Sequence, residues 1–392
     1  MKKYKPENIF YIIFDKHISV IEKIHSFGYK AYFIGGCVRD AVMGNKPNDF
    51  DIATNARPEN IKDIFADVKD KGITFGTVTV LYNQYKYEVT TFRKEYGYSD
   101  NRKPDLVIFS DSLYDDVRRR DFTINTLAFD GIYIYDYYNA FADISNRVLK
   151  SVGSAKRRFF EDALRILRGV RFASILDLEV DNQTMENMKK YSYLLKLISK
   201  ERIYSELFRI IETGKNLNIL FDTMIAENIF KYPQYINRND LMSGSYECRL
   251  TDVFTHYPDG DKIKLELQNL KIDNKTINTV IDVIKYSKMD TDEKSIRKLL
   301  TKISENSISV LLEYKRQSQQ VLDEIIQKGY ILKVNDLKIS GYDIIAMGFS
   351  KERIKEIKKM LFEKAVYDIS LNTKEKLMDI IKTAYDNSIV KQ

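Results

Sequence analysis

The sequence predicts an α+β N-terminal head, with helices around a mixed β-sheet, followed by an all-α C-terminal half. Apolar and polar residues alternate with the period of a strand in several segments of the first 150 residues, most clearly at 76–82 and 85–92. Beyond about residue 155 this alternation disappears, and apolar residues recur at helical spacing through most of the remainder. At 392 residues, the chain is long enough for two or more domains with buried cores.

The elements of the head follow from local patterns. Apolar spacing predicts a helix over 13–27 that Gly28 ends, and Pro58 marks the first turn of a second helix. The pair Asn83-Gln84 between two alternating segments predicts a β-hairpin. The polar stretch 94–105 contains Gly97 and Pro104, so we expect a mobile loop there. Further segments are expected as follows: strands at 31–34, 106–109 and 132–135, and a helix around 121–129.

Composition excludes several classes of protein. Hydrophobic residues at 44% and charged residues at 30% are typical of a soluble globular chain, and the net charge of +7 favours polyanionic partners. Two cysteines provide no disulfide framework and suit a reducing cytoplasm, and three scattered histidines do not predict a zinc site. The apolar run from Ile9 to Phe14 is too short for a signal peptide or a membrane span.

The stretch from Ala31 to Ile52 carries the main chemical prediction. Asp49 and Asp51 are two apart on an expected strand, so their carboxylates point to one face. Two convergent carboxylates suit Mg²⁺, which also takes waters and substrate phosphates as ligands. Gly35 and Gly36 let the backbone approach a phosphate and offer N–H groups at the start of a helix. Together these features predict a site for a metal-bound nucleoside triphosphate.

The order G-G-x-V-R-D followed by D-x-D resembles the class II tRNA nucleotidyltransferases and the related bacterial poly(A) polymerases. The resemblance implies a nucleotidyltransferase head and the addition of CCA to tRNA 3′ ends from CTP and ATP. It implies that Mg²⁺ is the cofactor, that tRNA is the partner, and that the protein is cytoplasmic. It implies no binding to DNA or to a membrane. It also places Gly35, Gly36 and Arg39 among the nucleotide-binding residues.

Glu88, on the second strand of the expected hairpin, has two interpretations. In the family a carboxylate on such a strand lies beside the Asp pair, which would make Glu88 a third catalytic carboxylate near the metal ions. The alternative is an ordinary cross-strand partner for a lysine. The sequence does not separate these two interpretations.

A second motif runs from Asp116 to Asn125 and resembles the family's R-R-D-F-T-x-N. Arg119 and Arg120 are suited to phosphate or ribose oxygens. We expect Asp121 and Asn125, four apart on a helix, to hold a 2′-hydroxyl. The alternative is a solvated basic helix start with Asp121 as its N-cap.

A third motif, F-F-E-D-A-L-R-I-L-R at 159–168, resembles the family's E-D-x-x-R, whose Asp and Arg read the incoming base. On a helix Asp162 and Arg165 would be neighbours, with Arg168 one turn later. Cytosine and adenine both present an amine donor beside a ring-nitrogen acceptor, whereas uracil and guanine present the opposite order. A carboxylate next to a guanidinium therefore accepts C and A and rejects U and G. The ordinary alternative is an exposed ion pair on an amphipathic helix.

The resemblance leaves the extent of the activity open. Asp100 and Arg102 resemble the flexible loop with which full CCA-adding enzymes change from C to A. Rival activities are the addition of CC only, of A only or of a poly(A) tail, and a rival from another class is a non-catalytic RNA-binding module. The intact metal carboxylates argue against that last alternative.

The resemblance divides the helical part into domains and adds candidate RNA contacts. Arg202, in a stretch similar to S-x-E-R-x-x-x-E-L, is expected to pair with Glu206 and to contact RNA. Relatives have glycines after the tail motif, where this chain has a basic helix that could bind tRNA through Lys351, Lys355 and Lys358. The expected domains are a catalytic head (1–140), a base-recognising neck (141–200), a helical body (201–325) and a tRNA-binding tail (326–392).

Overall fold

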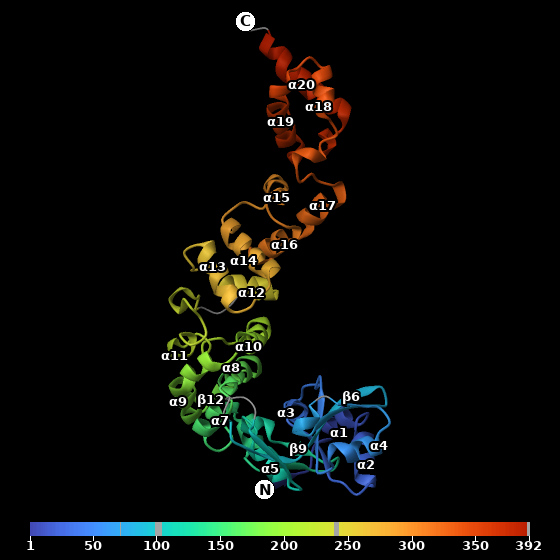
Figure 1. The fold of residues 1–392 in the computed structure, drawn as a ribbon, viewed down its shortest axis with the longest axis vertical. Coiled ribbons are helices and arrows are strands. Elements are labelled where there is room, and N and C mark those ends of the chain that lie inside the picture. The colour runs from blue at the N-terminus through green and yellow to red at the C-terminus, as the bar shows by residue number, and fades with distance from the viewer. Residues whose placement is uncertain (71, 99–103, 239–242, 390–392) are drawn as a thin grey trace. The chain divides into compact units, whose positions relative to one another are not determined.

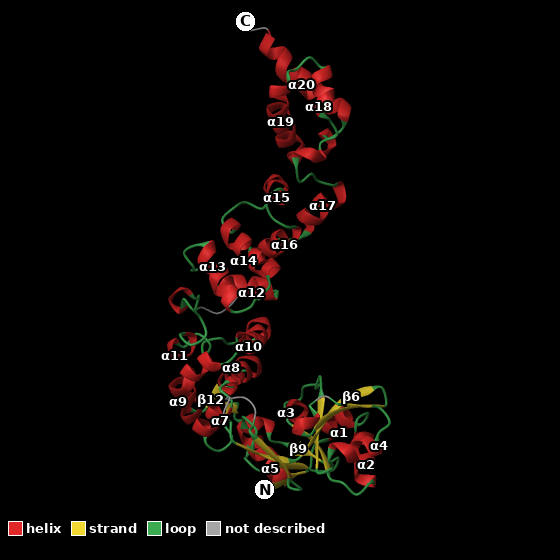
Figure 2. Cartoon of the chain, viewed as in Figure 1, coloured by secondary structure: helices red, strands yellow, loops and turns green. Residues whose placement is uncertain are grey.

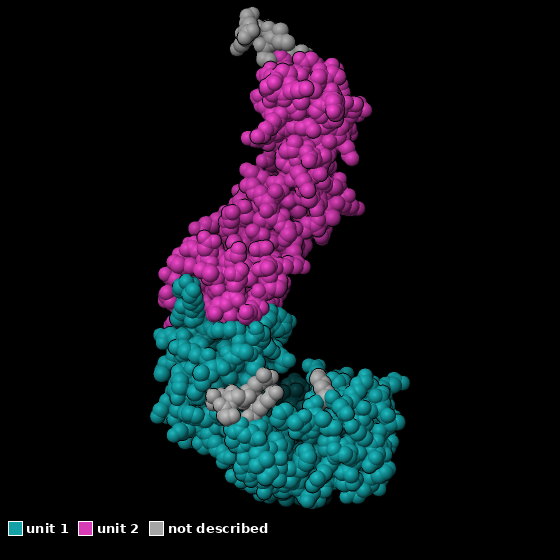
Figure 3. All heavy atoms as spheres, in the orientation of Figure 1, with its two compact units in different colours: residues 1–233 teal, residues 234–392 magenta. Residues whose placement is uncertain are grey.

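The computed structural model describes residues 1–70, 72–98, 104–238 and 243–389. The chain forms two compact units, Met1–Pro233 and Gln234–Gln392 (Figure 3). In the described residues, strands occur only in the first unit and the second is helical (Figure 2). This arrangement confirms the predicted fold class. The finer boundaries at 140, 200 and 325 stay a prediction.

The first unit is built on a mixed eight-stranded sheet with the strand order β1-β10-β9-β2-β3-β6-β5-β4. Figure 1 labels β6 and β9 of this sheet. Only the β3–β6 pair is parallel, and the other neighbouring pairs are antiparallel. Its strands are β1 (Lys2–Tyr4), β2 (Ala31–Ile34), β3 (Phe50–Thr54), β4 (Val68–Lys69), β5 (Thr77–Tyr82), β6 (Tyr85–Thr91), β9 (Ala128–Phe129) and β10 (Ile134–Asp136). Two small sheets join β7 (Arg93–Tyr96) to β8 (Leu106–Phe109) and β11 (Val148–Leu149) to β12 (Glu179–Val180).

The period-two alternation of the strands divides the core between the two faces of this sheet. Phe33 points to one face, where its ring lies 4.8 Å from that of Phe14 on α1 (Asn8–Phe14). Ile34 points to the other and packs with Ala53 and with Leu113 of α5 (Leu113–Arg118). Because Asp51 has the same parity as Ala53, its carboxylate projects from this second face. The remaining head helices are α2 (Ile18–Ser26), α3 (Gly36–Val42), α4 (Pro58–Ile64) and α6 (Ala140–Ser145).

Three predicted segments of the head differ from the structure. The helix expected over 13–27 is two helices, α1 and α2, and His17 in the break stacks on Phe50. The loop expected over 94–105 begins as strand β7, paired with β8. The helix expected around 121–129 is absent, because Phe122 forms a β-bridge with Ser151 and only 123–125 makes a 3₁₀ turn. The predicted hairpin is confirmed, with Asn83 and Gln84 both at positive φ in its turn.

The helices after the head complete the first unit. The longest are α8 and α10, which pack against each other, and both carry sequence-predicted site residues. The helices of this part are α7 (Ala155–Glu161), α8 (Leu164–Leu176), α9 (Asn182–Tyr191), α10 (Lys200–Thr213) and α11 (Thr223–Ala226).

Two apolar clusters lie among the described residues of the second unit. One gathers around Ile296, Leu299 and Leu311, and the other around Ile344, Ile357 and Leu361. None of the helices that the structure describes is both long and apolar enough to cross a membrane. The helices of this unit are α12 (Tyr246–Val253), α13 (Gly260–Asn269), α14 (Asn274–Tyr286), α15 (Glu293–Leu300), α16 (Glu305–Tyr314), α17 (Gln320–Lys328), α18 (Gly341–Ala346), α19 (Ile354–Tyr367) and α20 (Lys374–Ile389).

Candidate active site

A polar pocket of about 500 Å³ in the first unit collects residues from all three motifs. Leu164, Arg171 and Phe172 also line it, and the sequence analysis had not singled out these three. Arginines outnumber carboxylates in its lining, so the pocket favours an anionic ligand. The sequence-predicted residues that line it are Gly36, Arg39, Asp51, Arg119, Arg120, Asp121, Asn125, Asp162, Arg165, Arg168 and Arg202.

The three candidate catalytic carboxylates lie at the start of the β3–β6 pair. Asp49 immediately precedes β3, and Asp51 is its second residue. Asp51 is aligned with Glu88 in the parallel register, so the two side chains project from the same face. Desolvation and repulsion from Glu88 and Asp49 raise the pKa of Asp51 above its ordinary value, although Arg120 opposes the rise.

This group of carboxylates suits a divalent cation that is completed by its substrate. Among the residues that the structure describes, no set of three His, Cys, Asp or Glu residues could hold a metal ion alone. Mg²⁺, however, is usually bound by one or two carboxylates together with water and substrate phosphates. The mutual repulsion that raises the pKa of Asp51 is the kind that a bound cation would relieve. Asp49 and Asp51 are therefore the residues that could hold the metal.

Gly35 lies where a side chain could not fit. Its φ is +78°, and a Cβ atom there would lie 2.8 Å from Nη1 of Arg120. At Gly36, the first residue of α3, the nearest atom to such a Cβ would be Nη2 of Arg39, at 3.8 Å. Gly35 is therefore favoured by its positive φ and by the closeness of Arg120, whereas a methyl group would fit at Gly36.

Asp116 is a buried carboxylate that orients two candidate phosphate ligands, and it was not among the site residues predicted from the sequence. Its Oδ1 accepts from Arg119 at 2.7 Å, and its Oδ2 accepts from Arg120 at 3.2 Å. Burial alone would raise the pKa of Asp116, but the two guanidiniums outweigh burial and hold it below its ordinary value. The spacing i, i+3 and i, i+4 is the signal that could have identified this residue.

Asp121 and Asn125 belong to a chain of hydrogen bonds that leads from α3 to α8. Arg39 donates to Asn125 at 2.7 Å, and Asn125 donates to Asp121 at 3.1 Å. Oδ2 of Asp121 accepts from Nε of Arg168 at 2.7 Å. Burial alone would raise the pKa of Asp121, but Arg168 and Asn125 hold it well below its usual range. The expectation of one helix carrying Asp121 and Asn125 is wrong, and in the structure Asp121 orients Arg168.

Asp162 and Arg165 both line the pocket, but their side chains do not pair with each other. Asp162 lies between α7 and α8 rather than within a helix, and its Oδ2 accepts from Arg202 at 2.8 Å. Arg165 donates to Glu161 at 2.8 Å and to the carbonyl of Arg119 at 3.0 Å. The simple alternative of an exposed i, i+3 ion pair is therefore wrong. The role of the two residues in reading a base stays a prediction.

Glu161 is a second carboxylate that the sequence analysis missed. One oxygen accepts from Arg157 at 3.0 Å and Arg158 at 2.6 Å, while the other holds Arg165. Desolvation lowers the pKa of Arg158 to about 10, although Glu161 opposes this effect. Glu161 thereby holds the guanidinium of Arg165, which lines the pocket.

The expected pair between Arg202 and Glu206 is also wrong. Arg202 turns toward Asp162, whereas Glu206 lies 3.0 Å from Arg171 on α8. Packing of α10 against α8 explains the change, because it brings a buried arginine within reach of Glu206. A prediction from one helix could not include this second helix.

The described lining of this pocket does not include Asp49, Glu88 or the three lysines of the tail. Asp100 and Arg102 fall outside the residues that the structure describes. Lys351 lies in a 3₁₀ turn before α19, and Lys355 and Lys358 lie on that helix, in the second unit. Lys351 and Lys355 are exposed, and Lys358 is partly exposed. Their contact with RNA stays a prediction.

Two family models match the chain. One, described as the poly A polymerase head domain, matches residues 31–150. The other, described as the probable RNA and SrmB-binding site of polymerase A, matches residues 177–236. The two matches cover the head and part of the helical region that follows it.

Curated relatives match almost the whole chain. The CCA-adding enzyme of Ligilactobacillus salivarius is 34% identical over 399 residues, covering 96% of this chain and 98% of the relative. That of Staphylococcus epidermidis is 32% identical over 397 residues, covering 94% and 97%.

Solved structures agree with these sequence matches. The CCA-adding enzyme of Bacillus stearothermophilus in complex with CTP is 26% identical, with a TM-score of 0.75, and the match covers 96% of this chain and 99% of that one. The Thermotoga maritima enzyme complexed with tRNA is 18% identical, with a TM-score of 0.66, and the match covers 98% of this chain and 100% of that one. Because the Thermotoga maritima enzyme is only 18% identical in sequence, this match shows a similar fold alone.

Proposed function

The chain belongs to the family of CCA-adding enzymes, and we propose that it adds C, C and A to tRNA 3′ ends from CTP and ATP, without a template and with release of pyrophosphate. One observation carries the proposal. A single pocket joins a carboxylate from the head, a set of anchored arginines, and Asp162 with Arg165. Such a pocket has a place for the metal, the triphosphate and the base of one nucleotide.

The arginines of the second motif are prepared to bind the triphosphate. Asp116 holds Arg119 and Arg120 before any ligand arrives, so little side-chain freedom is lost on binding. Phosphoryl transfer needs mainly position and charge from the protein, and anchored guanidiniums supply both. The guanidinium of Arg120 lies close to Gly35, which immediately precedes α3, and the N–H groups at the start of that helix are suited to the same phosphates.

Asp49 and Asp51 would hold Mg²⁺, with Glu88 beside them on the neighbouring strand. When bound, Mg²⁺ supplies a lower pKa for the attacking 3′-hydroxyl and charge neutralisation for the pyrophosphate. Asp51, near the start of β3, and Glu88, in the middle of β6, are aligned and project from one face, which orients both carboxylates toward the same space.

Free donor and acceptor positions support the reading of the base. A guanidinium has five N–H donors, and Arg165 uses three of them on Glu161 and on the carbonyls of Arg158 and Arg119. Two donors remain for a ring nitrogen. Among the described residues, each oxygen of Asp162 accepts one hydrogen bond and keeps capacity for an exocyclic amine. The contacts of both side chains to the protein also fix where these free groups point.

The product ladder tests the proposed function. Purified protein is incubated with tRNA that lacks its 3′ CCA, first with each labelled NTP and then with CTP and ATP together. We expect two additions from CTP alone and a third when ATP is also present. Two additions with no third, a single A, or a long A tail would identify one of the narrower activities. No extension with any NTP would contradict the proposal.

A further inference from the structure

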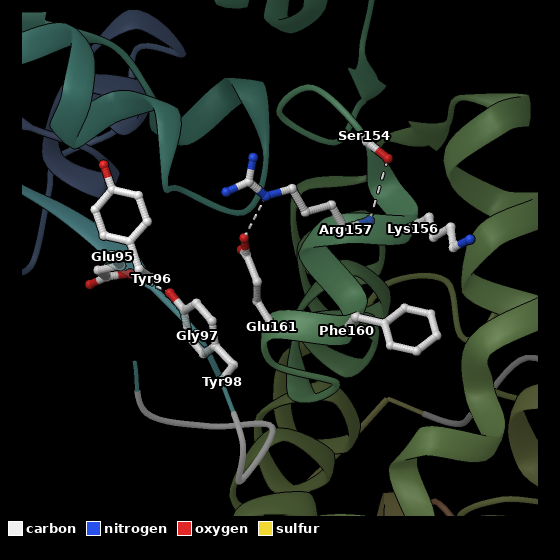
Figure 4. Close-up of a pocket in the computed structure, with 9 residues that line it drawn as sticks. All are labelled: Glu95, Tyr96, Gly97, Tyr98, Ser154, Lys156, Arg157, Phe160 and Glu161. Carbon is white, nitrogen blue, oxygen red and sulfur yellow. Dashed lines mark hydrogen bonds and ion pairs between the residues drawn. The ribbon is translucent and has the colours of Figure 1, made fainter. Parts of the chain in front are cut away.

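Glu95, the third residue of β7, is a carboxylate that has no role in the proposed reaction so far. Its side chain is only 6% exposed, yet it is not in the described lining of the candidate active site. Figure 4 shows Glu95 on the same segment as Tyr98, across a neighbouring pocket from helix α7. Burial of a charge is costly unless the charge is paired, so the partners of Glu95 are informative.

The partners of Glu95 are two guanidiniums and a hydroxyl. Its Oε1 accepts from Nε of Arg93 at 2.7 Å and from Nη1 of Arg119 at 3.3 Å. Its Oε2 accepts from Oη of Tyr98 at 2.6 Å. Burial alone would raise the pKa of Glu95, but Arg119 and Arg93 outweigh burial and hold it below its ordinary value. Glu95 is therefore ionised at neutral pH and is a strong acceptor for both guanidiniums.

Arg119 is the partner that lines the candidate active site. Its Nε and Nη2 both donate to Oδ1 of Asp116, at 3.0 and 2.7 Å. Hydrogen bonds that end on one oxygen hold the guanidinium in place but leave it free to swing about that oxygen. The bond from Nη1 ends on a separate strand, at Glu95, and therefore restricts this swing.

The restriction matters for the donors of Arg119 that remain free. A guanidinium has five N–H donors, and Arg119 uses three of them on Asp116 and Glu95. One N–H group is left on each terminal nitrogen. Asp116 fixes where these groups lie, and Glu95 fixes the direction in which they point.

We propose that Glu95 is a positioning residue that orients the guanidinium of Arg119 toward the triphosphate of the incoming nucleotide. The inference rests on the proposed function for the ligand of Arg119. The alternative is that Glu95 only attaches β7 to the segment that carries Asp116. Lys94 and Asp115 make such an attachment, with Nζ 3.3 Å from Oδ2, and they provide a matched control.

The test compares Glu95→Ala with Asp115→Ala in the full-length protein. Two quantities are measured: kcat/KM for CTP and ATP with tRNA, and the Kd for CTP by calorimetry without tRNA. Glu95→Ala should lower kcat/KM for both nucleotides and raise the Kd for CTP, each roughly ten- to a hundredfold, the range for one hydrogen bond to a charged group. Asp115→Ala should leave both values close to those of the parent, because Asp115 pairs with Lys94.

A double-mutant cycle separates orientation of Arg119 from a general loss of structure. In an Arg119→Ala background, Glu95→Ala should cause no further loss of kcat/KM, because the guanidinium that it orients is gone. Glu95→Gln keeps an acceptor at nearly the same place and should recover most of the loss. If Glu95→Ala does not fold, as judged by circular dichroism, the cycle is measured with Glu95→Gln, whose smaller loss should also vanish in the Arg119→Ala background.

Two results would overturn the role of Glu95. One is equal values of kcat/KM and Kd for Glu95→Ala and Asp115→Ala. The other is a loss of kcat/KM that is as large without Arg119 as with it. If the parent protein extends tRNA while either result is found, the proposed function stands and only the positioning role is wrong. A parent that extends no tRNA would contradict the proposed function, and the Kd values for CTP would still decide the role of Glu95.

Discussion

Replacement of Gly35 by alanine should damage both stability and nucleotide binding. The backbone of Gly35 has φ +78° and ψ −124°, a conformation that is nearly restricted to glycine. A residue with a Cβ atom held in such a conformation costs about 1–3 kcal/mol. The added methyl group would also lie 2.8 Å from Nη1 of Arg120. Because Asp116 holds that guanidinium, Arg120 cannot move away without weakening its ion pair.

The cost can be measured as a shift in thermal unfolding. In a domain of 150–250 residues, 1 kcal/mol lowers the Tm by roughly 2–4 °C, so 1–3 kcal/mol corresponds to about 2–12 °C. The first unit, Met1–Pro233, is of this size. Displacement of Arg120 should also raise the KM for both CTP and ATP, because this arginine is proposed to bind the triphosphate. Differential scanning calorimetry and initial rates with each nucleotide provide the two readouts.

Gly36→Ala is the matched control. The nearest atom to its new Cβ would be 3.8 Å away, an ordinary contact, and alanine favours the first turn of α3 more than glycine does. We expect its Tm to be equal to that of the parent or higher. If Gly35→Ala and Gly36→Ala had the same Tm and the same KM values, the argument from backbone and space would be refuted.

Four further outcomes are expected. Asp51→Asn should abolish most incorporation of both C and A, through loss of several kcal/mol of charge stabilisation, with nearly unchanged tRNA affinity in a filter-binding assay. Arg165→Ala and Asp162→Ala should each reduce discrimination against UTP and GTP about ten- to a hundredfold in single-turnover incorporation, and unchanged preference ratios would contradict base reading. Asp116→Asn should cost about 3–5 kcal/mol at pH 7. The pKa of Asp116 is depressed in the folded state, so its ionised carboxylate stabilises the fold above its unfolded pKa, near 4. This stabilisation is lost as the pH falls below that value. The denaturation curves of parent and variant should therefore converge at low pH. Replacement of Lys351, Lys355 or Lys358 alone should lower the slope of log tRNA affinity against log salt by about one unit. An unchanged slope after replacement of all three would indicate that these lysines form a solvated face.

The head could be predicted well where a local rule applies. The alternation of apolar and polar residues with a period of two predicted the strands and the hairpin. The positive φ of Asn83 and Gln84 agrees with the expected turn. The same rule predicted that one strand carries both Asp49 and Asp51, but β3 begins only at Phe50, and of the two only Asp51 is in the described lining of the pocket. It could not show that Glu88 would be aligned with Asp51, because the register between two parallel strands depends on contacts that are distant in the sequence.

Predictions failed where a distant partner competes with a local one. Helical spacing suggested that Arg202 pairs with Glu206, but Asp162, forty residues earlier, binds Arg202 instead. Asp116 and Glu161 were missed because acidic residues within a basic motif look like solvated charges. Their burial appears only when the segments that surround them are assembled.

Glu161 has a consequence for the order in which ligands bind. Its two oxygens hold Arg157 and Arg165, which face different pockets. A ligand that draws Arg157 away from this carboxylate leaves it a stronger acceptor for Arg165, and a ligand that draws Arg165 away leaves it a stronger acceptor for Arg157. By thermodynamic linkage, each ligand must then change the affinity of the other by the same factor, whichever arrives first. One shared side chain would thus couple a ligand at Arg157 to a ligand at Arg165, whichever of them binds first.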